Sequence, residues 1–197
     1  MQKALDAFRD SINRVHHLGG LHKAILSLTT PAIDASDLLR AQIVLAVSAL
    51  DFYVHEITVV GMLEVFGGER PATSAFEKYR VSVGAMIAGV PTGTHDWFEA
   101  DVRERHSFLS FQQPDKIADA IRLFSDVKLW PNVATALGQD DATVKARLRL
   151  IVDRRNKIAH EADLDPSFPD TRWPITEADV IGSCRFLSQT VEAIHGV

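Results

Sequence analysis

The sequence predicts an all-α protein that forms a single domain over residues 1–197, a helical bundle built around a long second helix. Apolar residues recur at spacings of three and four along almost every segment, as on one face of a helix. No alternating strand pattern competes with them. A content of 46% hydrophobic and 24% charged residues is ordinary for a globular chain, and 197 residues suffice to bury one core.

The two longest predicted helices come first. Residues 2–28 carry an apolar face, with a weak point at Gly19–Gly20 and an end at Pro31. Residues 36–66 form the second helix, with Ser36 or Asp34 as its N-cap and Gly67–Gly68 as its end. Apolar residues on more than one face of this second helix predict a central position in the bundle.

Shorter helices are predicted over the rest of the chain, at residues 73–88, 95–111, 115–124 and 133–137. Residues 140–160 form the next strong helix, with Asp140 or Asp141 as its cap. Thr176 caps the last helix, which runs to about residue 194, and Asp179 completes a capping box.

Charge and cysteine content limit the functional classes. The net charge of −5 argues against a general nucleic-acid coat, because affinity for a polyanion comes mainly from phosphate neutralisation. The single cysteine, Cys184, excludes an internal disulfide and indicates a reducing cytoplasm; we expect it to be a small core residue. The N-terminus lacks a signal-peptide pattern, and the longest apolar stretch, "IVLAVSAL", is far short of a membrane span.

A basic strip interrupts this acidic chain. Between positions 145 and 157, six basic residues face the single acid Asp153: Lys145, Arg147, Arg149, Arg154, Arg155 and Lys157. Such a strip is either a focused anion site or a basic helical face near a C-terminal dipole. Charge alone leaves both interpretations open.

Arg155 occupies an unusual position within this strip. At about 100° per residue, it falls on the apolar side of its helix, whose other members are Val144, Leu148, Ile151 and Ile158. Arg149, Asn156 and His160 share roughly the opposite side. A guanidinium in a packed stripe needs an acidic partner or an anion. Asp51 is a candidate partner.

The second helix carries a polar stripe formed by Ser48, Asp51, His55 and Thr58. In one interpretation, Asp51 and His55 pair with each other or cap neighbouring loops. In the other, they orient groups of a site on a facing helix. A serine hydrolase triad is excluded because a mid-helix serine has neither a nucleophile elbow nor oxyanion donors.

Two segments of the sequence carry a family resemblance. "RNKIAH" resembles the Arg-x4-His motif of HEPN domains, in the form Arg-Asn-x3-His. "DLLRAQIVLAVSALDFYVHEI" is similar to the long second helix of the RiboL-PSP-HEPN branch. The two segments occur in the family's order and separation, and the resemblance spans residues 5–195.

The resemblance implies a HEPN-type bundle acting as a metal-independent endoribonuclease, without cofactors and as a homodimer. Its partners would be RNA and an antitoxin or antiviral defence protein. Arg155, Asn156 and His160 match the motif, although Arg154 would match an Arg-x5-His form. Tyrosine, nucleotidylated in some family toxins, is replaced two residues after the histidine by Ala162, so that modification is not expected.

The residue types suit RNA cleavage through the substrate's own 2′-OH. Histidine moves protons near neutral pH, and arginine stabilises charge on the phosphate. We expect Asn156 to bind the phosphate or orient the histidine, with supporting roles for Arg149, Arg154, Lys157, Asp51 and His55. Arg155 and His160 lie about 140° apart on an ideal helix. Either the helix loosens before His160 or a second subunit completes the site, and we favour the dimer.

Other candidates are weaker. His16, His17 and His22 are expected on exposed helix surface, and His95 and His106 on a solvated face, with no metal site. "VFGGER" lacks the lysine and serine of a phosphate-binding loop. The alternative function is a catalytically inactive HEPN-type dimer that binds RNA, a nucleotide or a protein partner as an assembly module.

Overall fold

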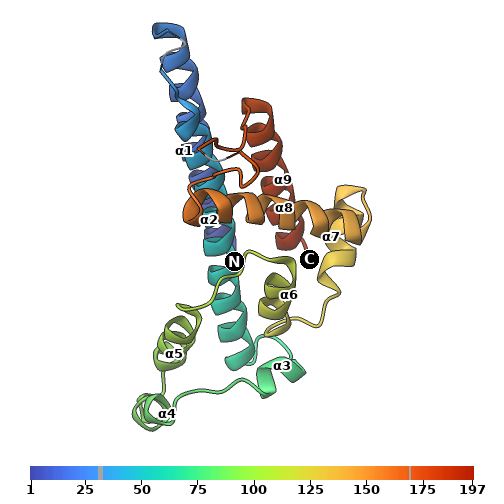
Figure 1. Cartoon of the computed structure of the whole chain (residues 1–197). Helices are drawn as coiled ribbons and strands as arrows, with labels where there is room; N and C mark the ends of the chain where they lie inside the picture. Colours follow the sequence, from blue (N-terminus) through green and yellow to red (C-terminus); the bar gives the residue numbers. More distant parts are fainter. Residues whose placement is uncertain (31–32, 169) are drawn as a thin grey trace.

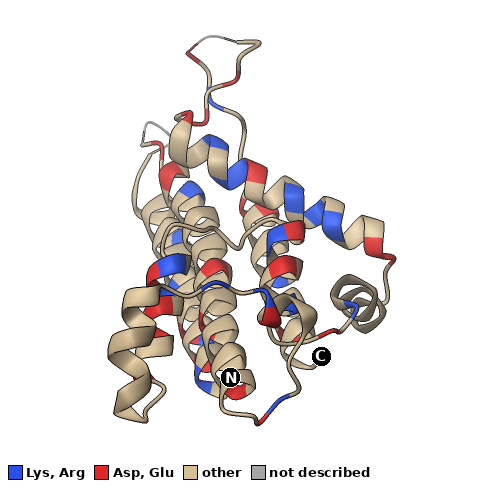
Figure 2. Cartoon of the chain, turned by 90° about the horizontal axis from the view of Figure 1, so that it is seen from below, with Lys and Arg blue, Asp and Glu red and all other residues tan. Residues whose placement is uncertain are grey.

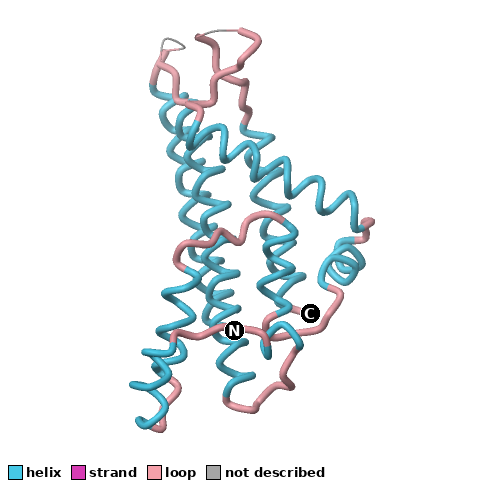
Figure 3. Tube along the Cα trace, turned by 60° about the horizontal axis from the view of Figure 1, so that its bottom comes forward, coloured by secondary structure: helices cyan, strands magenta, loops and turns pink. Residues whose placement is uncertain are grey.

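Two long antiparallel helices form the axis of the fold (Figure 1). The computed structural model describes residues 1–30, 33–168 and 170–197. Helix α1 (Gln2–Leu28) packs along α2 (Ser36–Phe66), and α2 also contacts the two long C-terminal helices. The all-α prediction is confirmed: the described residues form helices and loops, with one isolated bridge between Leu164 and Arg172 (Figure 3).

Helix α1 is continuous through the predicted weak point at Gly19–Gly20. A Cβ atom on Gly19 would lie 3.0 Å from Oε1 of Gln42, so this glycine permits a close approach between α1 and α2. Gly20 has open space around its Cα. Pro31, the predicted end of the helix, lies outside the described residues.

Helix α2 has the predicted bounds but a different N-cap residue. Ala35 is the N-cap residue, while the Asp34 carboxylate accepts a hydrogen bond from the Ser36 backbone N–H at 2.8 Å. By length and composition α2 is long and apolar enough to cross a membrane, which the sequence analysis did not anticipate. More than half of its most apolar window is buried inside the fold, as in a core helix.

The region after α2 is more broken than predicted. The expected helix over residues 73–88 is two short helices, α3 (Ser74–Glu77) and α4 (Val83–Gly89), followed by the 3-10 turn η1 (Val90–Thr92). The break has a local cause: Ser82 caps α4 by accepting the Ala85 N–H, and its own N–H donates to Asp101. Helix α5 (Asp96–His106) also ends earlier than the predicted residue 111.

The C-terminal half follows the predicted order. Helices α6 (Pro114–Arg122), α7 (Leu129–Leu137), α8 (Asp141–His160) and α9 (Glu177–His195) are joined by loops. Helix α7 begins four residues before the predicted 133, and its buried Trp130 donates a hydrogen bond to the Pro114 carbonyl. The Asp140 cap and the Thr176–Asp179 capping box are both present.

The main core joins α1, α2 and α6 to α9. Its largest fully buried side chains include Phe8, Tyr53, Phe186 and Leu148. Cys184 is buried there as expected, and burial raises the pKa of its thiol to about 11. A smaller cluster packs α5 against the end of α2 and consists of Val59, Met62, Phe98 and Val102. Helix α8 crosses the long helices (Figure 1), and its C-terminal end lies beside the first turns of α2.

Candidate active site

Helix α8 carries the candidate motif and is regular to its end. Asp140 accepts a hydrogen bond from the Thr143 N–H at 2.9 Å, which fixes the first turn. At the other end the Glu161 N–H donates to the Lys157 carbonyl at 3.0 Å, so α-helical bonding continues past His160. Of the two alternatives for joining Arg155 and His160, a helix that loosens before His160 is therefore not observed.

Most of the basic strip on α8 is compensated within the chain (Figure 2). Lys145 pairs with Asp141 at 2.9 Å, and Arg149 with Asp115 at 3.4 Å. The Arg147 guanidinium lies 4.6 Å from the centre of the Phe186 ring and donates to the Gly182 carbonyl. Most basic residues of the strip thus bind groups of the same chain. Arg155 is an exception to this pattern.

Arg154 is held by the loop that follows α8. Its Nη2 donates to Oδ2 of Asp163 at 2.8 Å and to the backbone carbonyls of Trp173 and Pro174 at 3.2 Å. Asp163 is 1% exposed, and Arg40 of α2 also donates to it, from Nε at 2.7 Å. This cluster of one carboxylate and two guanidinium groups ties α2, α8 and the loop together.

The loop itself adopts unusual backbone angles. Ala162 and Asp163 have φ angles of 53° and 59°, in the left-handed region that non-glycine residues rarely occupy. Two backbone hydrogen bonds hold this turn. The Asp163 N–H donates to the Lys157 carbonyl, and the Trp173 N–H donates to the Asp163 carbonyl. The Lys157 ammonium lies 4.9 Å from the centre of the Trp173 ring, so Lys157 also contacts the loop.

Arg155 has a different environment from Arg154. Its side chain is partly buried, and Nη1 donates to Oδ1 of Asn156 at 3.1 Å. Its Nε is buried and has no hydrogen-bond partner among the described residues. Within the part of the chain that the structure describes, no carboxylate lies within ion-pair distance of Arg155. Asn156 therefore contacts Arg155. One of its two expected roles was to orient His160, and this contact does not serve that role.

Asp51 is not the partner of Arg155. Its carboxylate accepts hydrogen bonds from the Phe111 N–H at 2.6 Å and from Nε2 of Gln112 at 3.0 Å. His55 Nε2 lies 3.8 Å from Asp51 Oδ1, and the His55 ring packs against Phe111 at 4.5 Å between centres. Of the two interpretations of the polar stripe, pairing and loop capping describe these contacts. Asp51 thus holds the loop between α5 and α6, residues 107–113, against α2.

His160 is exposed at the end of α8. It lies five positions after Arg155, which in a regular helix corresponds to about 7.5 Å along the axis and about 140° around it. Two open hollows flank this part of the helix. One, of about 470 Å³, is bordered by Val44, Leu45, Ile158 and Ala162; the other, of about 550 Å³, by Leu150, Asn156, Lys157 and Glu161, among others. Neither is lined by Arg155 or His160.

Two histidines are buried where the sequence predicted exposure. His22 is 7% exposed and His106 is 3% exposed, and Nδ1 of each is buried without a hydrogen-bond partner in the described part of the chain. Burial, with the nearby His55 as a second cause, lowers the pKa of His106 to about 4. The prediction failed for His106 because Arg103 and Arg105 pair with carboxylates, whereas the imidazole packs against the rings of Tyr79 and Phe111.

No side-chain cluster suited to a metal ion occurs in residues 1–30, 33–168 and 170–197, taking groups of three or more His, Cys, Asp or Glu. Sequence reasoning missed Arg40, Asp163 and Trp173, the residues that immobilise Arg154. The only sequence signal was the acidic turn "EADLDP" directly after the basic strip.

The family comparison agrees with this architecture. The sequence model of RiboL-PSP-HEPN matches residues 9–197, nearly the whole chain. The chain belongs to the RiboL-PSP-HEPN family. Neither a curated protein nor a solved structure matches it significantly. In this HEPN chain the motif residues Arg155, Asn156 and His160 all lie on α8, which packs against α2.

Proposed function

We propose that this HEPN protein is a metal-independent endoribonuclease whose catalytic residues are Arg155 and His160. The supporting observation is the contrast between the two adjacent arginines. Arg154 is bound to the buried Asp163, whereas the only hydrogen-bond partner of the Arg155 side chain in the described structure is Asn156. A phosphate oxygen would supply the anion that Arg155 lacks.

In the proposed reaction the ribose 2′ oxygen attacks the adjacent phosphorus. The new O2′–P bond forms as the P–O5′ bond breaks, which leaves a 2′,3′-cyclic phosphate and a 5′-hydroxyl. His160 takes the proton from the 2′-OH, and water supplies a proton to the leaving O5′. The hydroxide that remains takes the proton back from the imidazolium, so no net proton is consumed. Arg155, oriented by Asn156, stabilises the charge that builds on the non-bridging oxygens.

The proposed site is completed by a second copy of the chain. Regular helix continues through His160, so Arg155 and His160 of one chain point about 140° apart. A two-fold axis near the end of α8 would set Arg155 of one chain opposite His160 of the other. Each dimer would then hold two equivalent sites.

The biological setting we infer is a toxin–antitoxin or antiviral defence system in the cytoplasm, with an antitoxin or defence protein as a further partner. Family membership supports this setting. The alternative, an inactive HEPN dimer that assembles with RNA, a nucleotide or a protein, predicts binding without cleavage. The same experiment distinguishes the two.

The test is cleavage of single-stranded RNA by purified protein in EDTA, with the ends identified by mass spectrometry. We expect 2′,3′-cyclic phosphate ends. His160→Ala and Arg155→Ala should each lower the rate by about 100-fold or more. Matched controls are His17→Ala and Arg122→Ala, which change an exposed histidine and an exposed arginine elsewhere. Cleavage that persists in both site variants, or that requires magnesium, rules the proposal out.

A further inference from the structure

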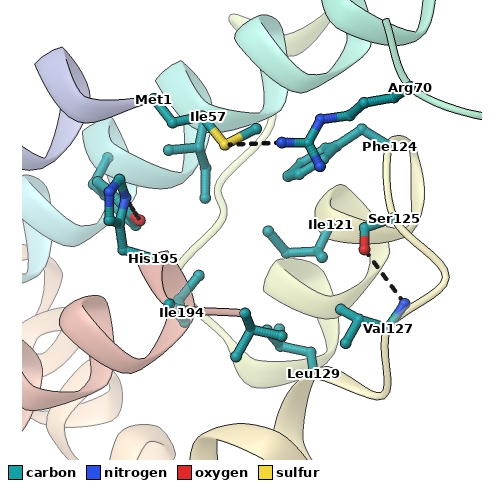
Figure 4. A pocket seen from close by; sticks show the side chains of 13 residues that line it. Met1, Ile57, Arg70, Ile121, Phe124, Ser125, Val127, Leu129, Ile194 and His195 are labelled. Atoms are coloured by element: carbon teal, nitrogen blue, oxygen red, sulfur yellow. Dashed lines mark hydrogen bonds between the residues drawn. The ribbon is translucent and has the colours of Figure 1, made fainter.

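A cavity of about 250 Å³ lies between α2, the α6–α7 connection and the end of α9 (Figure 4). No α8 residue lines it, and neither the HEPN motif nor the proposed reaction uses it. Apolar residues form more than half of its lining; the buried members are Tyr53, Ile57, Ile121, Phe124, Leu129 and Ile194.

A guanidinium group lies at one side of this cavity. Arg70 pairs through Nε with Glu64, and the group lies 5.8 Å from the centre of the Phe124 ring. Among the described residues, the Met1 sulfur is the only hydrogen-bond partner of its Nη2, at 3.8 Å. A thioether is a weak acceptor. The Nη edge of Arg70 is therefore available to a stronger acceptor that enters the cavity.

The opposite side of the cavity is polar. Figure 4 shows His195 across the space from Arg70, with Ile57, Ile121 and Ile194 around this space. The Tyr53 hydroxyl lies 3.2 Å from Nδ1 of His195. Tyr53 is fully buried, and burial raises the pKa of its hydroxyl, so this group stays neutral. The cavity thus has one cationic edge, an apolar middle and a polar end.

We propose that this cavity is a binding site for a small aromatic carboxylate. The carboxylate would accept hydrogen bonds from the Nη edge of Arg70, displacing the Met1 sulfur, and the ring would lie among the isoleucines. Size supports one substituted ring, since a cavity of roughly 150 Å³ accommodates benzene and this one is about 250 Å³. A charged oxygen acceptor fits the guanidinium better than a neutral one.

Phenylacetate is a suitable probe, and binding is measured by calorimetry and by ¹H–¹⁵N NMR shifts. We expect saturable binding, with the largest shifts at the residues around the cavity. Acetate, which lacks the ring, and phenylacetamide, which lacks the charge, should each bind about tenfold more weakly or worse. Equal binding of phenylacetate and phenylacetamide contradicts the role given to Arg70. Absence of phenylacetate binding contradicts the proposed ligand class.

Two variants locate the site. Arg70→Gln should weaken phenylacetate binding by about tenfold or more. Ser125→Phe, at the half-buried edge of the cavity, should fill the space and abolish binding without removing a core group. The matched control is Arg103→Gln, which removes another half-exposed, ion-paired arginine outside this cavity and should bind normally. Circular dichroism verifies folding. Unchanged binding in both cavity variants overturns the assignment.

This inference does not depend on the ribonuclease proposal. Phenylacetate binding is measured without RNA, and the cavity variants leave Arg155 and His160 intact. Binding with no RNA cleavage leaves the cavity assignment standing alone. Cleavage with no binding leaves only the ribonuclease.

Discussion

Asp163 Oδ2 lies 2.8 Å from Nη2 of Arg154, so the chain turns back after α8 and neutralises one of its two adjacent arginines. Arg40 shares the same oxygen from α2. The next residue, Arg155, has no such carboxylate in the described structure. Neighbouring residues of the same type therefore have different energetic roles, which substitution can separate.

Replacing each arginine by leucine should have opposite consequences for stability. Arg154→Leu removes a charged hydrogen-bond partner of the buried Asp163, and we expect the free energy of unfolding to fall by about 1.5–3 kcal/mol. Arg155→Leu removes a buried, unpartnered Nε donor and restores the apolar stripe. Its stability should match or exceed that of the wild type, while RNA cleavage is lost. Urea denaturation followed by circular dichroism measures the difference, and equal losses in both variants would contradict it.

Asp163 itself provides a second test. Asp163→Asn keeps the size of the side chain and its tolerance for a φ of 59°, but removes the charge between Arg40 and Arg154. We expect a loss of about 3 kcal/mol or more in unfolding free energy and faster hydrogen exchange at the Trp173 N–H. The control is Asp170→Asn, since Asp170 also has a positive φ, 68°, but is exposed. A comparable loss in the control would assign the effect to backbone strain.

The helices were largely predictable, whereas the partners of charged residues were not. Apolar spacing and caps such as Asp140 and Thr176 are local signals, and they placed the long helices within a residue or two. Asp163 pairs with Arg40, which is 123 residues away in the sequence, and Asp51 binds the backbone of a loop 60 residues away. Helical spacing places Arg155 on a face but contains no information about which distant carboxylate reaches that face.

Glycines in the two long helices should respond oppositely to alanine. Gly20→Ala in α1 meets open space, so its higher helix propensity should stabilise the protein by about 0.5–1 kcal/mol. Gly61→Ala in α2 sets a Cβ 2.3 Å from the Phe124 ring, and displacing that buried ring should cost about 1–3 kcal/mol. Thermal unfolding of both variants measures this. Destabilisation by Gly20→Ala would mean that α1 bends at the glycine pair in solution.

His106 should make stability depend on pH. Its pKa in the folded protein is lowered from 6.5 to about 4 by burial and by His55, so between these values the unfolded chain binds the proton that the folded chain excludes. Stability is fully present above pH 6.5 and is lost as the pH falls toward 4, at up to about 1.4 kcal/mol per unit.

His106→Phe keeps a ring between Tyr79 and Phe111 and removes the titrating group. The unfolding free energy of this variant should fall less between pH 7 and 4 than that of the wild type. His17→Gln, which changes an exposed histidine, should behave as the wild type does. Parallel pH profiles for wild type and His106→Phe would show that His106 is not buried in solution.

The burial of His106 marks a second limit of sequence reasoning. The segment "THDWFEADVRERHSF" is rich in charge, which indicates a solvated helix. In the structure Arg103 pairs with Glu56 and Glu99, and Arg105 with Asp101, so most charges of this segment are satisfied in ion pairs. The imidazole is left among Tyr79 and Phe111. Charge content predicts exposure of a segment, and it does not decide the exposure of a single residue within it.

The shared site predicts complementation between two inactive chains. Arg155→Ala and His160→Ala homodimers each lack one group at both sites and should be inactive. In a hybrid dimer, Arg155 of the second chain meets His160 of the first, so one site is intact and the other carries both defects. Random exchange makes half the dimers hybrid, and about a quarter of wild-type activity should return on mixing. If each chain instead formed its own site from Arg155 and His160, every site in the hybrid would lack one group and mixing would restore nothing. Subunit exchange is verified separately by light scattering and by labelled chains. A failure to recover activity after complete exchange contradicts the shared site. Cleavage by a monomer at nanomolar concentration contradicts it as well.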